Sequence, residues 1–182
     1  LSDGMFVDFK DLISPFDRHT ATNIQAGMGY GKSVASHNVI EYYILQARRT
    51  GVKFVICLVT SRVLYAKGKF LALKSFLSER RLDAEVGLHL YLETEGEKDV
   101  EPGDIIISSA ESLHRFKFDT SLPTLLLIDE SYAVFKQFLS PTHDKNQVDN
   151  YRTFEGLAQS DNTSFVCLDA NLTDLTMKYN VA

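Results

Sequence analysis

The chain has 182 residues, of which 45% are hydrophobic and 24% charged, a composition typical of a globular domain with a substantial core. No apolar run reaches the ~18 residues of a membrane span. The net charge of −5 argues against a domain that binds nucleic acid through a broad basic face.

Cys57 and Cys167 lie in apolar runs, which predicts buried reduced thiols. The expected location is therefore reducing, nucleus or cytoplasm.

Short apolar runs alternate with amphipathic stretches along the chain. Strands are predicted at 20–26, 53–59, 84–93, 104–109, 124–130 and 164–169, and helices at 33–49 and 61–81. The second helix is expected to bury one face made of Val63, Ala66, Phe70, Leu73 and Leu77. Segments 93–103 and 140–150 are predicted to be polar surface loops. The alternation predicts one α/β domain over 1–182, with a mainly parallel central sheet between two helical layers.

The segment 26–33, Ala-Gly-Met-Gly-Tyr-Gly-Lys-Ser, lies between a predicted strand and a predicted helix. This is the context of a phosphate-binding loop, in which glycines let successive N–H groups face a phosphate and the helix start adds its dipole. Lys32 is predicted to reach the β- and γ-phosphates of ATP, and the Ser33 hydroxyl to ligate Mg²⁺. Ala26 stands where the usual pattern has its first glycine. The predicted phosphate cradle comprises Gly27, Met28, Gly29, Tyr30, Gly31, Lys32 and Ser33.

A second acidic motif follows the apolar run 125–128, as Asp129 and Glu130. A carboxylate that ends a buried parallel strand lies at the carboxyl edge of the sheet, where the phosphate loop is also expected. Asp129 is predicted to hold Mg²⁺, and Glu130 to orient and deprotonate the attacking water. The alternative is that the pair is simply a polar strand end at a turn.

Two further strand ends carry short polar residues. Thr60, Ser61 and Arg62 follow one predicted strand, and Ser108 and Ser109 end another. Hydroxyls and N–H groups there are suited to a sugar-phosphate backbone, a contact that carries no sequence preference. The alternative interpretation is that these residues are ordinary helix N-caps.

Five segments together resemble the motifs of superfamily-2 helicases. Residues 26–33 resemble motif I, 58–68 motif Ia, 105–116 the motif that follows it, 129–132 motif II and 169–172 motif III. The Ser-Leu-His-Arg sequence at 112–115 and the Asp-Ala-x-Leu sequence at 169–172, with Ser-Pro-Thr after motif II, are most similar to those of the origin-of-replication-binding helicases of herpesviruses and related large DNA viruses. The resemblance implies a RecA-like domain, the first of two, with a second such domain of the same polypeptide as its partner.

The resemblance also implies a function: a motor that couples Mg²⁺–ATP hydrolysis to movement on single-stranded nucleic acid, DNA in this subfamily, during replication. Asp169 and Asn171, at the motif III position, would couple the nucleotide site to the nucleic acid. A simpler interpretation makes Asp169 the N-cap of a helix at 172–179. Two rival functions stay open, another P-loop enzyme such as a packaging ATPase or small-molecule kinase, and a degenerate P-loop domain kept as an interaction module.

Overall fold

The computed structural model describes residues 16, 20–25, 31–139 and 146–170. Six strands form one parallel sheet in the order β1-β8-β7-β2-β5-β3. Their bounds are β1 Ala21–Gln25, β2 Val55–Thr60, β3 Gly87–Leu90, β5 Asp104–Ser109, β7 Thr124–Asp129 and β8 Thr163–Asp169. A separate two-stranded parallel sheet pairs β4 (Lys98–Asp99) with β6 (Phe116–Lys117).

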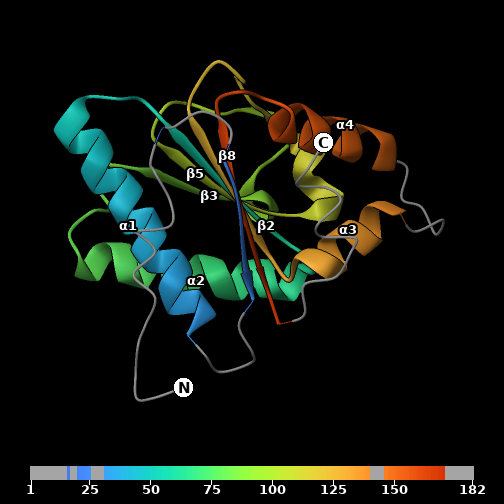
Figure 1. Cartoon of the computed structure of the whole chain (residues 1–182), viewed down its shortest axis with the longest axis horizontal. Coiled ribbons are helices and arrows are strands. Elements are labelled where there is room, and N and C mark those ends of the chain that lie inside the picture. Colours follow the sequence, from blue (N-terminus) through green and yellow to red (C-terminus); the bar gives the residue numbers. More distant parts are fainter. Residues whose placement is uncertain (1–15, 17–19, 26–30, 140–145, 171–182) are drawn as a thin grey trace.

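Helices cover both faces of the large sheet (Figure 1). Helices α1 (Lys32–Thr50) and α2 (Val63–Glu79) pack on one face, and α3 (Ser131–Leu139), α4 (Gln147–Ala158) and the 3₁₀ helix η3 (Ala110–Arg115) on the other. A second 3₁₀ helix, η2 (Tyr91–Glu93), follows β3. The three-layer α/β architecture with a parallel sheet is confirmed.

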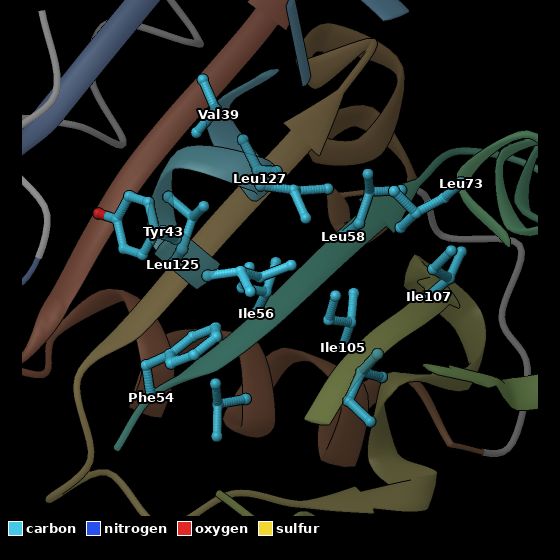
Figure 2. Close-up of a cluster of buried hydrophobic side chains, with 14 of the residues drawn as sticks. Val39, Tyr43, Phe54, Ile56, Leu58, Leu73, Ile105, Ile107, Leu125 and Leu127 are labelled. Atoms are coloured by element: carbon cyan, nitrogen blue, oxygen red, sulfur yellow. The ribbon is translucent and has the colours of Figure 1, made fainter. Parts of the chain in front are cut away.

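Period-2 alternation along the strands divides the apolar side chains between the two layers. Figure 2 shows Ile56, Leu58, Leu125 and Leu127 of the sheet facing Tyr43 and other side chains of the α1–α2 layer. The residues that alternate with them in sequence, including Cys57, Leu126 and Ile128, face the α3–α4 layer. Both cysteines are buried and unbridged, as expected. In the described part of the chain, no helix has the length and apolar character to span a membrane.

The first helix begins and ends at glycines with left-handed backbone conformation. Gly31 has φ 79° at the N-cap, and Gly51 has φ 72° at the C-cap, where its N–H donates to the carbonyl of Ala47. A left-handed residue is the common way to end a helix, and glycine adopts it at no steric cost. Gly51 therefore ends this helix, close to the predicted bound at residue 49, and Gly31 sets the direction in which the chain enters α1.

Three details differ from the sequence expectations. The strand predicted at 84–93 is confined to β3, because β5 is its only strand partner in the described sheet and their pairing ends at Leu90. Residues 147–150 belong to α4, where Asn150 is buried although the segment is polar. Val63 begins α2 outside the buried face and is 46% exposed, whereas Ala66, Phe70, Leu73 and Leu77 are buried as predicted.

A buried carboxylate organises the amino end of β5. One oxygen of Asp104 lies 3.0 Å from Nε2 of His89, and the other accepts a hydrogen bond from the N–H of Glu101 at 3.0 Å. Lys98 Nζ lies 3.6 Å from the second oxygen. His89, within the strand predicted at 84–93, is a half-buried partner of this carboxylate. Gly87 leaves room for the group, since a Cβ there would lie 2.3 Å from Asp104 Oδ1.

We expect Gly87→Ala to lower the free energy of unfolding by about 1–3 kcal/mol, because the new methyl group forces Asp104 away from His89. Urea denaturation monitored by circular dichroism measures the change. Gly68→Ala is the matched control, since Gly68 lies in α2 and a Cβ added there would meet nothing within 4 Å. That control should be neutral or stabilising. A Gly87→Ala variant as stable as wild type would contradict the account of this cluster.

Candidate functional site

The residues predicted to act together meet at one edge of the sheet, because every strand of a parallel sheet points the same way. Gln25, the last residue of β1, pairs with Asp169, the last residue of β8. Asp129 at the end of β7 lies beside Leu168 of β8, while Thr60 of β2 pairs with Ser109 of β5. This carboxyl edge is where α/β proteins bind ligands.

The described part of the glycine-rich segment forms the start of α1. The carbonyl of Gly31 accepts the N–H of Ala35 at 2.9 Å, and that of Lys32 accepts the hydroxyl of Ser36 at 2.8 Å. The free N–H groups and dipole of a helix N-terminus favour an anion. Lys32 and Ser33 are thus located in the first turn of α1. Gly27, Met28, Gly29 and Tyr30 lie outside the described residues.

Ser33 and Asp129, the two predicted Mg²⁺ ligands, are joined by a residue that sequence analysis missed. The ammonium of Lys69, from α2, donates to Ser33 Oγ at 2.9 Å and forms an ion pair with Asp129 Oδ2 at 2.8 Å. In the sequence, Lys69 is recognisable only as a lysine next to Phe70, one of the residues predicted to form the buried face of this helix. Only the packing of α2 beside α1 and β7 reveals its role.

Lys69 also affects a neighbouring histidine on α1. Burial, and secondarily the positive charge of Lys69, lower the pKa of His37 below its ordinary value. The His37 ring packs on Phe76 of α2 with centroids 4.9 Å apart. The neutral ring is therefore favoured near Lys69 at neutral pH.

Glu130 occupies the turn between β7 and α3 with φ 56°, a left-handed conformation that is uncommon outside glycine. Its N–H donates to the carbonyl of Leu168 at 2.9 Å, which fixes the turn against β8. Its carboxylate accepts the hydroxyl of Ser61 at 3.1 Å. The carbonyl of Ser61 in turn accepts the side-chain amide of Gln137 from α3. The carboxylate predicted to act on the attacking water is thus hydrogen-bonded directly to the strand end predicted to contact nucleic acid.

Four of the five residues predicted to contact nucleic acid have buried side chains: Thr60, Ser61, Ser108 and Ser109. The hydroxyl of Thr60 donates to the carbonyl of Arg62 at 3.2 Å, and that of Ser108 to the carbonyl of Ser109 at 2.9 Å. Arg62 is exposed. The N-cap interpretation of these residues also lacks geometric support, because neither α2 nor η3 begins with a side-chain capping bond.

Asp169 caps a helix other than the one expected. Its Oδ2 accepts the N–H of Tyr132 at 2.8 Å and the hydroxyl of Ser131 at 3.1 Å, both in the first turn of α3. A carboxylate there satisfies a free backbone N–H and complements the helix dipole. The strand end of β8 is therefore joined to the turn that carries Glu130. Asn171 and the helix predicted at 172–179 lie outside the described residues.

The donor set at this edge suits a magnesium–nucleotide complex better than a metal held by protein alone. In the described ranges, no three His, Cys, Asp or Glu side chains gather into a group that could hold an ion. Mg²⁺ commonly takes one or two protein oxygens and completes its shell with water and phosphate oxygens. Ser33 and Asp129 supply such oxygens, and both already contact a cation, the Lys69 ammonium.

A comparison with solved structures finds the same fold in the DEAD-box helicase Mss116 bound to ssRNA and UDP-BeF. The TM-score is 0.59 at 17% sequence identity, and the match covers 90% of this chain and 35% of the helicase chain. A scan against protein-family models and a search of curated proteins find no match. The chain thus shares the parallel-sheet α/β fold found in this helicase structure and spans about a third of the length of the neighbour.

We expect Asp169→Ala to lower the free energy of unfolding by about 1–3 kcal/mol, since it removes the cap of α3 and leaves the buried Ser131 hydroxyl without this acceptor. Thermal and urea unfolding measure the loss. Asp161→Ala, at an exposed site just before β8, is the control and should stay within about 0.5 kcal/mol of wild type. Equal stability of the two variants would show that the cap contributes nothing.

Proposed function

We propose that this chain is the nucleotide-binding motor domain of a helicase, which couples Mg²⁺–ATP hydrolysis to movement on single-stranded nucleic acid. One observation supports the proposal above the others. Ser33 of the glycine-rich segment and Asp129 of the acidic motif, 96 positions apart in sequence, converge on a single cation position. Glu130 stands beside them and contacts the neighbouring strand end through Ser61.

Each residue has a defined role in the proposed reaction. The start of α1 and Lys32 bind the phosphates, and Ser33 and Asp129 hold Mg²⁺. The bound metal supplies positive charge that offsets the charge developing on the phosphates. Glu130 orients the attacking water and accepts its proton. The left-handed turn and the Ser61 hydrogen bond fix the direction of the Glu130 carboxylate, which an in-line attack requires.

The nucleic acid is proposed to cross the same edge near the start of α2. Arg62 is exposed there, and Leu64 and Tyr65 also face solvent in the first turn of the helix. Arginine can contact a phosphate backbone, and an exposed aromatic ring can stack on a base without selecting its identity. Because the side chains of Thr60, Ser61, Ser108 and Ser109 are buried, their proposed contribution is limited to backbone groups and to holding the loops in place.

The more specific proposals concern the polynucleotide and the partner domain. We propose DNA, in replication, with an origin-binding role, because residues 112–115 and 169–172, together with Ser-Pro-Thr at 140–142, resemble the corresponding motifs of origin-binding helicases. The structural neighbour is described with ssRNA, so binding tests must include both polymers. We further propose that a second RecA-like domain of the same polypeptide supplies the opposing wall of the nucleotide site. The coupling proposed for Asp169 acts through its cap on α3, adjacent to Glu130.

We expect Lys32→Ala to lose nucleotide binding while the fold is retained, because Lys32 is proposed to act as a charge on the phosphates. A ligand at 100 times its dissociation constant stabilises a protein by about 2.7 kcal/mol. Thermal melting with and without Mg²⁺–ATP measures this stabilisation in wild type and variant. Lys53→Ala is the matched control, since Lys53 is exposed and precedes β2 at the opposite edge of the sheet. Equal ligand-induced stabilisation in Lys32→Ala and Lys53→Ala would refute the phosphate-binding role.

We expect Glu130→Gln to retain ATP affinity and to lose hydrolysis in the complete protein. Glutamine keeps the shape and can still pair with Ser61, but it cannot accept a proton from water. Equilibrium binding and steady-state turnover, with single-stranded DNA and RNA in separate assays, distinguish the two effects. A general base typically contributes ~10²–10⁴-fold to the rate. Unchanged turnover would mean that another group accepts the proton.

A further inference from the structure

Lys69 occupies the position where the proposed nucleotide site needs a metal ion. Its ammonium contacts Ser33 Oγ at 2.9 Å and Asp129 Oδ2 at 2.8 Å. Both oxygens act as acceptors toward Lys69, which is the role they have toward a metal ion. The lysine side chain is 17% exposed and that of Asp129 13%. The pair is therefore largely shielded from water and screened less by salt than a surface ion pair.

The ammonium and a magnesium ion cannot share these oxygens. Mg²⁺ lies ~2.1 Å from each oxygen ligand, so an ion bound by Asp129 Oδ2 would be no more than about 5 Å from Nζ in its present position. Repulsion between like charges at that distance disfavours joint occupancy. Lys69 has a flexible four-carbon stem, and its helix is anchored by Phe70 and Leu73 in the core. The side chain can therefore move away while α2 stays in place.

We propose that Lys69 is a built-in substitute for the metal ion: its ammonium neutralises Asp129 and positions Ser33 until Mg²⁺ arrives with the nucleotide and displaces it. This inference rests on the proposed nucleotide site. It makes Lys69 a positioning residue that lowers the dependence of nucleotide binding on Mg²⁺. His37 of α1, which packs on Phe76 of α2, lies near Lys69, and its lowered pKa favours the neutral ring at neutral pH.

Removing the ammonium has two effects, and both raise the ratio of the nucleotide dissociation constant in EDTA to that in Mg²⁺. Without Mg²⁺, Lys69→Met leaves the Asp129 carboxylate unpaired beside the phosphate site, so metal-free nucleotide is repelled and binds more weakly. With Mg²⁺, no ammonium competes for Asp129 and Ser33, so half-saturation needs less metal. The ratio of the dissociation constant in EDTA to that in Mg²⁺ should therefore rise by about tenfold or more, as expected for one unscreened charge pair.

The test measures the affinity of a fluorescent ADP analogue by anisotropy, in EDTA and across a Mg²⁺ titration. Lys69→Met is compared with wild type and with Lys67→Met, which removes an exposed lysine from the same helix. Lys69→Gln, neutral but polar, is a second variant in case the methionine disturbs folding, and circular dichroism checks both. A ratio raised by about tenfold in a folded Lys69 variant, with Lys67→Met unchanged, supports the proposal.

Two results would overturn it. A ratio equal to that of wild type means that Lys69 does not compete with the metal. An equal loss of affinity in EDTA and in Mg²⁺ means that Lys69 is an ordinary phosphate contact. If wild type itself binds the analogue under neither condition, the proposed nucleotide site fails, which is distinct from failure of the Lys69 inference.

Discussion

The uniform direction of the strands is the constraint on which the candidate site depends. All neighbouring pairs in the six-stranded sheet are parallel, so the residues that end β1, β8, β7, β2 and β5 lie along one edge. An antiparallel neighbour would send its strand end to the opposite edge, about the length of a strand away. Convergence of Ser33, Asp129, Glu130 and Asp169 thus follows from pairing and topology rather than from proximity in sequence.

The carboxylates at this edge are each held by a different partner. Asp129 pairs with Lys69 of α2, Glu130 accepts Ser61 after β2, and Asp169 caps α3. Charged hydrogen bonds of this kind hold side chains in one direction, which a site needs before substrate arrives. They also link Ser33 at the start of α1, through Asp129 and Glu130, to the residues just before α2. A change at Glu130 or Asp169 can therefore alter the loop that carries Arg62. This is how the proposed coupling between the nucleotide site and the nucleic acid would act.

Apolar runs and glycine positions in the sequence predict those helices and strands whose limits are set by residues close to them in the chain. The buried strands β2, β5, β7 and β8 and the closure of α1 at Gly51 follow from apolar runs and glycine conformation. Helices α3 and α4 were not predicted, and the first turn of α4 was assigned to the loop at 140–150 because it is polar. Asn150 is buried there because it pairs with His114 and Glu111 across a tertiary contact. Lys69 was missed for the same reason, since nothing near it in sequence indicates that Asp129 lies 2.8 Å away.

The sequence predicts which polar residues lie at the strand ends, but it does not predict which groups their side chains contact. Asp169 was expected at the motif III position, yet its partner helix is separated from it by 38 residues of sequence. The hydroxyls of Thr60 and Ser108 were expected to face a ligand, and instead they donate to nearby carbonyls. Short hydroxyl side chains readily bond to adjacent backbone, so sequence alone does not distinguish that use from ligand contact.

Hydrogen–deuterium exchange with and without saturating Mg²⁺–ADP tests the central claim most directly, because it reports where the nucleotide binds without any substitution. We expect slower exchange at the start of α1, whose free backbone N–H groups would face the proposed ligand, and in the turn around Glu130, because bound ligand would make opening of this turn less frequent. Exchange at the opposite edge, around Lys53 and Gly103, should not change. Protection confined to that opposite edge, or none at either edge, would contradict a nucleotide site at the carboxyl ends of the strands.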